Sequence, residues 1–238
     1  MNSLLYGFGL FETIRVSGGV PEFLHYHIRR MAGSARFFGL EFSEESFMNA
    51  LAEALADRSP DADWRVRLSL FLEGGRPVYL ASAEPLGFVP DAVQLAVSGI
   101  RVFSENPLCQ HKTTSRLIYY LAQREAESAG YWDGLLLNER DEVAETGRAN
   151  IFFLIDNEIF TPPVSSGVLP GIMREVLLRR GLASERVLFA SDIRRASAAF
   201  VTNSLIRAAA VSRIEGFEYE HDAAALQEIR DALLSELR

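Results

Sequence analysis

Hydrophobic positions along the chain follow two spacings, one typical of strands and the other typical of helices. Alternating or short continuous apolar runs predict strands over residues 5–16, 64–72, 92–97, 135–137, 143–153 and 158–161, and from residue 198. Apolar residues three to four positions apart predict helices over 23–40, after Ser43, after residue 112, from about 171, and over 222–237. This mixture predicts an α+β protein.

The size of the chain is compatible with two cores. Its 238 residues are 48% hydrophobic, which is enough for one large core or two modest ones. The irregular run FSENPLCQ, residues 103–110, interrupts the pattern and has the composition of a linker. We therefore expect a small N-terminal α/β domain with its linker over residues 1–106 and a larger C-terminal domain over 107–238.

Charge and cysteine content restrict the class of function. The net charge is −8 and no basic run is concentrated anywhere, which argues against a nucleic-acid surface. The single cysteine, Cys109, cannot form an internal disulfide, as suits a reducing cytoplasm. No segment has the length and apolar character of a signal peptide or a membrane span. We expect a cytoplasmic protein without a metal site.

The stretch from Gln110 to Phe153 combines a clear pattern with candidate chemistry. Lys112 lies at a junction between a loop and a helix, and Glu145 lies near the start of the strand that returns after the polar turn NERDE. A lysine at such a junction is most often a solvated surface residue. The spacing alone therefore leaves a structural and a catalytic interpretation open.

This stretch resembles the core of the class IV aminotransferase family. That family contains branched-chain aminotransferases, D-amino acid aminotransferases and aminodeoxychorismate lyases, all of which use pyridoxal 5'-phosphate (PLP). The resemblance implies PLP fold type IV, with a pseudo-barrel sheet in the C-terminal domain. It also implies that Lys112 of the HKT segment forms the Schiff base with PLP. Glu145 of AETGRAN would pair with the pyridine nitrogen, and Asn150 also stands in its expected place.

The N-terminal segment YGFGLFETIR is similar to a family segment that lines the substrate side of the pocket. The matching residues, which the resemblance assigns to the substrate, are Tyr6, Phe11, Glu12 and Thr13. Phe8 departs from the pattern, because the family usually has aspartate there. Without the resemblance, this segment is a strand loosened by two glycines.

Three further segments resemble the family's phosphate anchors. In HYHIRRM, His27 and Arg30 match a motif whose arginine reaches the phosphate, a task that suits a planar guanidinium. In LPGIMR, Ile172 and Met173 would offer backbone amides at a helix start, with Met173 replacing the usual threonine. Alone, these features are an exposed helix arginine and an ordinary helix start.

The third anchor lies in TNSL at the end of an apolar strand. The resemblance assigns the amide of Asn203 and the hydroxyl of Ser204 to the phosphate, and Thr202 to the substrate. Three small polar residues at this place could equally cap a following helix.

The choice of reaction within the family remains between two alternatives. TNSL and Arg116, four residues after Lys112, are more similar to the lyases, whereas Arg207 and Ala210 stand where lyases often have glycine and proline. A lyase would convert 4-amino-4-deoxychorismate to 4-aminobenzoate and pyruvate, a step toward folate, and a transaminase would act on branched-chain or D-amino acids. A non-catalytic α/β binding domain is the alternative of another class, favoured by Phe8 and the short lead before residue 6. Members of the family are typically dimers, so the resemblance also implies a homodimer.

Overall fold

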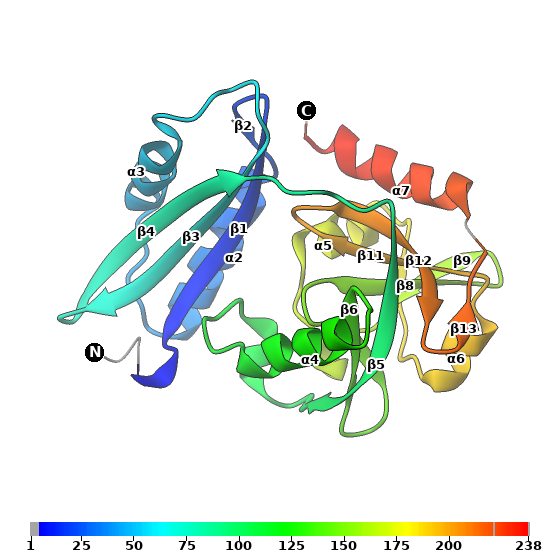
Figure 1. Ribbon diagram of the computed structural model, residues 1–238. Helices are drawn as coiled ribbons and strands as arrows, with labels where there is room; N and C mark the ends of the chain where they lie inside the picture. Colours follow the sequence, from blue (N-terminus) through cyan, green and yellow to red (C-terminus); the bar gives the residue numbers. More distant parts are fainter. Residues whose placement is uncertain (1–4, 221, 238) are drawn as a thin grey trace. The chain divides into compact units, whose positions relative to one another are not determined.

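The computed structural model describes residues 5–220 and 222–237, which form two compact units (Figure 1). Unit 1 consists of residues up to Val89 together with His111–Arg116, and unit 2 consists of Pro90–Gln110 and the chain from Leu117 onward. We expected a boundary near residue 106, whereas in this division unit 2 begins at Pro90. Strand β5 (Ala92–Val102) precedes residue 106 but pairs with strands of unit 2, and His111–Arg116 returns to unit 1.

Unit 1 is built on an antiparallel sheet whose strand order is β2-β1-β3-β4. Its strands are β1 (Gly9–Ser17), β2 (Val20–Pro21), β3 (Trp64–Glu73) and β4 (Arg76–Pro85), and its helices are α2 (Leu24–Phe37) and α3 (Glu44–Leu55). Leu10, Ile14, Val66 and Leu68 are buried on one face against both helices. The alternation in the sequence therefore leaves Phe11 and Thr13 on the opposite face.

Helix predictions in unit 1 are confirmed, whereas the strand limits change. Ser43 caps α3, and its Oγ accepts a hydrogen bond from the Ser46 amide at 3.1 Å. The first strand begins at Gly9 rather than residue 5, because Gly7 takes a left-handed conformation with φ 61°. Strand β4 is absent from the prediction. Gly74 and Gly75, with φ 57° and 80°, form a two-residue hairpin turn, although their composition indicates a break.

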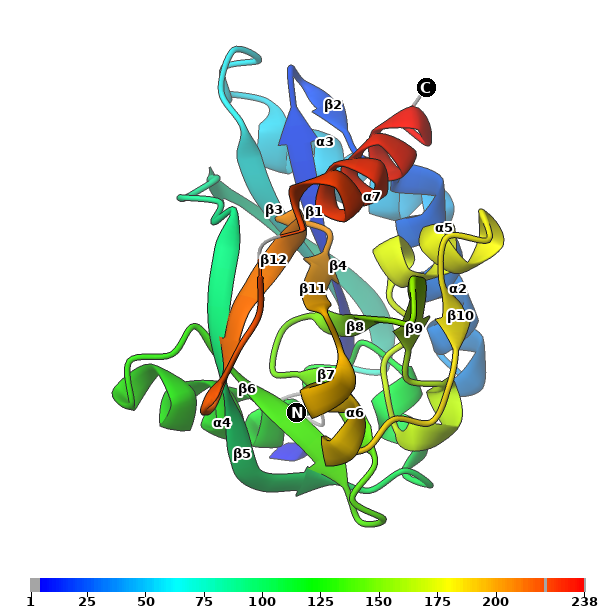
Figure 2. The same ribbon diagram turned by 90° about the vertical axis from the view of Figure 1, so that its right-hand side faces the viewer.

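Unit 2 contains, among the described residues, a nine-stranded mixed sheet in the order β10-β9-β8-β11-β12-β5-β6-β7, with β13 added to β12. β5 is parallel to both β6 and β12. Figures 1 and 2 show that the sheet is strongly curled, since β5 and β8 run in different directions. The remaining strands are β6 (Asp133–Asn138), β7 (Val143–Thr146), β8 (Asn150–Ile155), β9 (Glu158–Thr161), β10 (Ser184–Glu185), β11 (Ala198–Asn203), β12 (Arg207–Ile214) and β13 (Phe217–Glu218).

The helices of unit 2 lie on the outside of this sheet (Figure 2). They are α4 (Leu117–Ser128), α5 (Ile172–Arg179), α6 (Ala190–Arg195) and α7 (Ala223–Ser235), with short 3₁₀ turns at Pro107–Gln110 and Val164–Ser166. No helix within residues 5–220 and 222–237 is long and apolar enough to cross a membrane.

Two predicted elements of unit 2 differ in the structure. The run predicted as one strand over 143–153 is two strands, β7 and β8, separated by a turn at residues 147–149. The polar trio that begins at Thr202 does not precede a helix, because β11 turns directly into β12 and Asn203 pairs with Arg207. Both changes create tight turns at the ends of neighbouring strands.

Helix α4 packs on the core through one face and exposes apolar side chains on another. Tyr119, Ala122 and Ala126 face the core, while Ile118 and Leu121 are 37% and 46% exposed. Together with Leu117 and Tyr120, these two residues form an exposed apolar surface on α4, which is called the α4 surface below.

Candidate active site

Lys112 is held against β1 by the backbone of its own segment. The Phe11 amide donates to the Lys112 carbonyl at 2.9 Å, and the Thr114 amide donates to the Gly9 carbonyl at 2.8 Å. The Lys112 side chain is half-buried, and its Nζ lies 4.6 Å from the centroid of the Phe11 ring. These two backbone hydrogen bonds to β1 fix the position of the Lys112 backbone.

A second cationic side chain, Arg67, lies against the ring of Phe11. The guanidinium carbon of Arg67 lies 3.8 Å from its centroid, a cation–π distance. Burial lowers the pKa of Arg67, and the charges of Arg65 and Arg116 lower it further, but a guanidinium remains charged at neutral pH. Within the described residues, Arg67 has no carboxylate partner. This half-buried charge suits an anionic group supplied from outside the chain.

Glu12 lies on the helix-facing side of β1 and joins two residues of α2. Its carboxylate accepts from Arg30 Nε at 2.9 Å and Nη2 at 2.5 Å, and lies 2.6 Å from His27 Nδ1. Burial alone would raise the pKa of Glu12, but Arg30 and His27 lower it to about 2. Glu12 is therefore a buried anion that orients Arg30.

His27 is completely buried beside this ion pair. Burial lowers the pKa of His27 despite the attraction of Glu12, and the charges of Arg30 and Lys112 act in the same direction as burial. The Nε2 atom of His27 is buried and has no hydrogen-bond partner among the described residues.

The remaining N-terminal residues occupy different environments. Tyr6 is 73% exposed before β1, and Thr13 is half-buried opposite Arg67 in the β1–β3 register. Phe8 packs edge-on against Phe38 at 6.0 Å, so the residue that replaces the family's aspartate extends the core of unit 1.

Within unit 2, Asn150 connects two segments of the predicted site. Its Nδ2 donates to Glu145 Oε2 at 3.1 Å and to the Leu169 carbonyl at 2.9 Å. Glu145 and Asn150 are both buried, 3% and 6% exposed. A Cβ added to Gly171 would lie 2.0 Å from Asn150 Oδ1, so only glycine permits this approach. The side chain of Asn150 thereby sets Glu145 beside the start of α5.

The start of α5 presents backbone donors. Ile172 and Met173 are its first two residues, where helical geometry leaves amides without intrahelical partners. The buried Arg174 fixes this end by donating to the Pro162 carbonyl at 2.8 Å and pairing with Glu185. Met173 is buried, so its side chain contributes packing where the family usually has a hydroxyl.

Thr202 and its neighbours lie beside Asn150. Thr202 pairs with Asn150 across β11 and β8, and its buried Oγ1 has no hydrogen-bond partner within the described part of the chain. Asn203 accepts from the Leu205 and Ile206 amides through Oδ1 and donates to the Arg148 carbonyl through Nδ2 at 3.2 Å. Ser204 is half-buried in the turn that Asn203 closes.

Apart from the exposed Tyr6, the predicted residues fall into one group in each unit. Phe11, Glu12, Arg30 and Lys112 are connected within unit 1, and Thr13 lies nearby on the same strand. The unit 2 group consists of Glu145, Ile172, Met173, Thr202, Asn203 and Ser204, connected through Asn150 and Arg148. Sequence reasoning overlooked Asp133, although a charged residue two positions before the apolar run 135–137 was the available signal.

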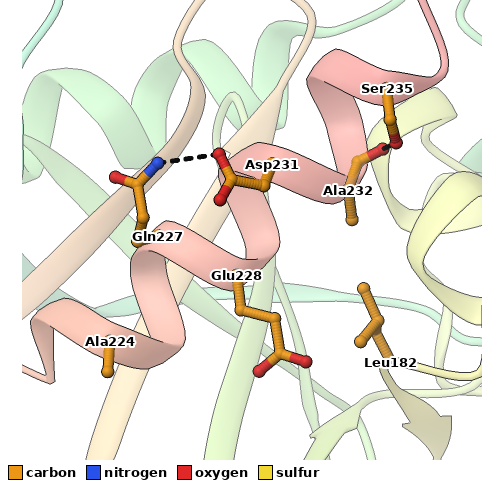
Figure 3. A pocket seen from close by; sticks show the side chains of 7 residues that line it. All are labelled: Leu182, Ala224, Gln227, Glu228, Asp231, Ala232 and Ser235. Carbon is orange, nitrogen blue, oxygen red and sulfur yellow. Dashed lines mark hydrogen bonds between the residues drawn. The ribbon is translucent and has the colours of Figure 1, made fainter.

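A separate shallow depression lies on unit 2 between α7 and Leu182 (Figure 3). The side chains that line it are Leu182, Ala224, Gln227, Glu228, Asp231, Ala232 and Ser235, and none is a predicted site residue. Gln227 and Asp231 bond to each other at 2.8 Å, so they do not converge on the depression. These lining residues include no lysine for a Schiff base and no arginine for a phosphate.

Comparisons with known proteins place this architecture in one fold. The structure described as a putative 4-amino-4-deoxychorismate lyase from Legionella pneumophila superposes with a TM-score of 0.89, 27% identity, and 98% and 93% coverage of the two chains. An aminodeoxychorismate lyase from Vibrio harveyi is 28% identical over 92% of this chain and 88% of its own length. A probable branched-chain-amino-acid aminotransferase from Thermotoga maritima is 27% identical over 86% and 77%. The mixed α/β architecture with curled sheets is PLP fold type IV, as predicted.

The sequence model of the amino-transferase class IV family matches residues 9–214. The chain belongs to this family and is one of its enzymes, which sets aside the alternative of a non-catalytic binding domain. The family depends on PLP. The groups present fit this cofactor, because unit 2 combines a buried carboxylate at Glu145, the amides at the start of α5 and the hydroxyl of Thr202, which has no hydrogen-bond partner among the residues that the structure describes.

Proposed function

We propose that this protein is a PLP-dependent 4-amino-4-deoxychorismate lyase. The observation that carries the proposal is Asn203 of TNSL, the segment that is more similar to lyases than to transaminases. Its side chain closes the β11–β12 turn and reaches the Arg148 carbonyl beside Glu145. The Legionella and Vibrio relatives, both described as lyases, support the same reaction.

The cofactor-binding roles follow from the resemblance and from the local contacts. Lys112 would hold PLP covalently through Nζ. Glu145, oriented by Asn150, would keep a proton on the pyridine nitrogen. The phosphate would be bound by Arg30, the amides of Ile172, Met173 and Asn203, and the hydroxyl of Ser204. Arg30 can serve because two of its five N–H donors bond to Glu12, which leaves three.

Bound PLP supplies an electron sink for the carbon that bears the substrate amine. Lys112 Nζ, released once the substrate amine has replaced it on PLP, would take the proton from that ring carbon, and the electron pair would expel the enolpyruvyl ether oxygen, so that the ring becomes aromatic. The same amine would return the proton to the methylene carbon of the departing enolpyruvate. The products are 4-aminobenzoate and pyruvate, and no other reactant is required.

Arg67 has the properties needed to bind a carboxylate of this substrate. It is half-buried, stacks on Phe11 and has no acidic partner among the described residues. The proposed substrate carries two carboxylates, and a bidentate guanidinium–carboxylate pair fixes orientation as well as position. Tyr6, Phe11, Thr13 and Thr202 would complete the substrate surface, while the buried Glu12 would act through Arg30.

A class IV aminotransferase acting on branched-chain or D-amino acids is the second candidate. It is favoured by the Thermotoga relative, described as a branched-chain aminotransferase, and by Arg207, which stands where lyases often have glycine. However, Arg207 has φ 58°, so the backbone keeps a conformation that glycine adopts easily. Lys112 and Glu145 would serve either reaction.

A paired product assay separates the two reactions. Purified protein with PLP receives 4-amino-4-deoxychorismate in one reaction, and a panel of amino-acid donors with 2-oxoglutarate in the other. We expect 4-aminobenzoate and pyruvate in equal amounts from the first, and little glutamate from the second. Turnover of an amino-acid donor without aminobenzoate formation would replace the lyase proposal with the aminotransferase.

The covalent role of Lys112 has its own test. Borohydride reduction of the PLP-loaded protein should fix the cofactor on the peptide that contains Lys112, and Lys112→Ala should abolish the label and the turnover. Arg116→Ala, in the same segment, is the control that should retain the label. Lys112 is the only lysine in the sequence, so a label on the N-terminal amine, or no label at all, would contradict the assignment.

We also propose that the protein is a cytoplasmic homodimer. The α4 surface supports the dimer, because Leu117 and Tyr120 are 67% and 55% exposed and lie one helical turn apart on one stripe. Apolar side chains gathered on one helix face commonly mark a protein interface. The acidic charge and the lone buried Cys109 are consistent with the cytoplasm.

A further inference from the structure

Asp133 is a buried carboxylate for which the proposed chemistry has no use. It is the first residue of β6 and is 0% exposed. Removing a carboxylate from water is costly unless donors and an opposite charge compensate it. Its surroundings therefore indicate what it holds in place.

Asp133 bonds to its neighbour Gly134 in β6 and to Arg148 in the turn between β7 and β8. Oδ2 accepts from the Arg148 amide at 2.9 Å and lies 3.5 Å from Arg148 Nε, while Oδ1 accepts from the Gly134 amide at 2.9 Å. Burial raises the pKa of Asp133, and the Arg148 guanidinium opposes that rise. Arg148 thus provides both a backbone donor and a charge.

The turn fits closely against this carboxylate. A Cβ added to Gly147 would lie 2.6 Å from Asp133 Oδ1 and 2.9 Å from the Tyr119 carbonyl, so no side chain can be placed there without a shift. The turn is closed by the Thr146 amide, which donates to the Ala149 carbonyl at 2.8 Å. Asp133 therefore sets the position of the whole turn from its inner side.

Both ends of this turn carry residues of the candidate site. Glu145 lies near the end of β7, before the turn, and Asn150 is the first residue of β8, after it. Asn150 Nδ2 donates to Glu145 Oε2 at 3.1 Å. The carbonyl of Arg148 accepts from Asn203 Nδ2 at 3.2 Å, which connects the turn to TNSL. A displacement of Arg148 would therefore reach both segments at once.

We propose that Asp133 is a positioning residue that sets Glu145 for the pyridine nitrogen and Asn203 for the phosphate by anchoring the Arg148 amide. This inference rests on the proposed PLP site, whichever of the two reactions that site performs. Asp133 touches neither substrate nor cofactor in this proposal, since its oxygens accept from the amides of Gly134 and Arg148.

The most informative variant is Asp133→Asn. An asparagine side chain has the same shape but only one accepting oxygen. Gly134 and Arg148 both present N–H donors, so in either amide orientation one of them faces an NH₂ group. Leu226→Ala in α7, which removes a buried side chain 3% exposed, is a control for general loss of stability in unit 2.

The first measurement uses the protein without cofactor. Amide hydrogen exchange in a peptide covering residues 143–150 should become about tenfold faster in Asp133→Asn, because the negative charge beside Arg148 and one of the two buried acceptors are lost. Leu226→Ala should leave this peptide unchanged at temperatures where the protein is folded. Equal exchange in the wild type and Asp133→Asn would overturn the anchoring role, independently of any PLP chemistry.

The second measurement titrates PLP into the same proteins. We expect Asp133→Asn to bind PLP at least tenfold more weakly, with a shifted visible absorbance maximum, and Leu226→Ala to match the wild type in both. Gly147→Ala displaces the same turn through its Cβ and should reproduce the effect if Asp133→Asn does not fold. Unchanged affinity and absorbance in the folded variants would refute the inference. A wild-type protein that binds no PLP would instead refute the proposed function.

Discussion

Glu12 and Arg30 form a bidentate ion pair inside unit 1, with 2.9 Å between Oε1 and Nε and 2.5 Å between Oε2 and Nη2. Glu12 is 1% exposed, and the side chain of Arg30 is 12% exposed. A long cationic side chain is thus held in one rotamer before any ligand is bound. This order lowers the entropic cost of binding a phosphate.

Glu12→Gln should reduce both stability and cofactor affinity. The substitution leaves the buried charge of Arg30 without its counter-charge, which costs about 3 kcal/mol of the free energy of unfolding. Urea unfolding without PLP measures the first effect, and PLP titration measures the second. Glu84→Gln is the control, because Glu84 is exposed and lies 3.9 Å from Arg65. If Glu12→Gln bound PLP like the wild type, Glu12 would not orient a phosphate ligand.

The same ion pair gives a defined dependence of stability on pH. Glu12 has a pKa of about 2 in the folded protein, whereas an ordinary glutamate titrates near 4.5. The unfolded chain takes up the proton first, so the contribution of Glu12 is complete above about pH 4.5 and is lost as the pH falls toward 2. The difference in urea midpoint between the wild type and Glu12→Gln should therefore shrink between pH 5 and pH 3. A constant difference over that range would contradict the lowered pKa.

Arg67→Gln should weaken substrate binding while leaving the cofactor in place. Loss of a charge-assisted hydrogen bond to a carboxylate predicts at least a tenfold rise in KM. The affinity for PLP should stay unchanged, since Arg67 contacts Phe11 rather than a predicted phosphate anchor. Arg65→Gln is the matched control on the same strand, because its side chain is 45% exposed. Equal KM values for all three proteins would show that the carboxylate binds elsewhere.

Sequence patterns predicted most elements because their burial follows simple periods. Helix α3 has its Ser43 cap and first-turn acids in the sequence, and α7 carries Leu226, Ile229 and Leu233 at helical spacing. Strand β4 was missed for a local reason, since a Gly-Gly pair can end a strand or turn a hairpin. Which of the two occurs depends on whether the chain after the glycines pairs with β3, as Arg76 does with Glu73, and the sequence alone does not show this pairing.

Motifs in the sequence suggested residues for the candidate site, but they did not indicate the contacts between those residues. Motif resemblance identified Glu12 and Arg30 separately and assigned them to substrate and phosphate. That they pair with each other follows from the packing of α2 on β1, which no spacing within either motif contains. Asp133 is a stronger case, because its partner Arg148 lies 15 residues away across a hairpin. Burial of charge is visible only once the fold is known.

The α4 surface yields a prediction about assembly. The double variant Leu117→Glu/Leu121→Glu places charges on adjacent turns of one exposed apolar stripe, and we expect it to weaken the dimer at least a hundredfold. Sedimentation velocity over a range of concentrations measures the change. Leu234→Glu on α7, at 39% exposure, is the control and should not alter the assembly. A double variant that remains dimeric at wild-type dilution would exclude α4 from the interface.

Two glycine-to-alanine substitutions should change stability in opposite directions. Gly33 lies inside α2, and an added Cβ meets no atom within 4 Å, so Gly33→Ala should raise the free energy of unfolding by about 0.5–1 kcal/mol. Gly171 has an ordinary φ of −70°, but its added Cβ would lie 2.0 Å from Asn150 Oδ1. Asn150 would have to leave Glu145 or the Leu169 carbonyl, which costs about 2 kcal/mol. Urea unfolding of both variants measures the two signs. A neutral Gly171→Ala would mean that Asn150 can move aside, and the close approach would then not position Glu145.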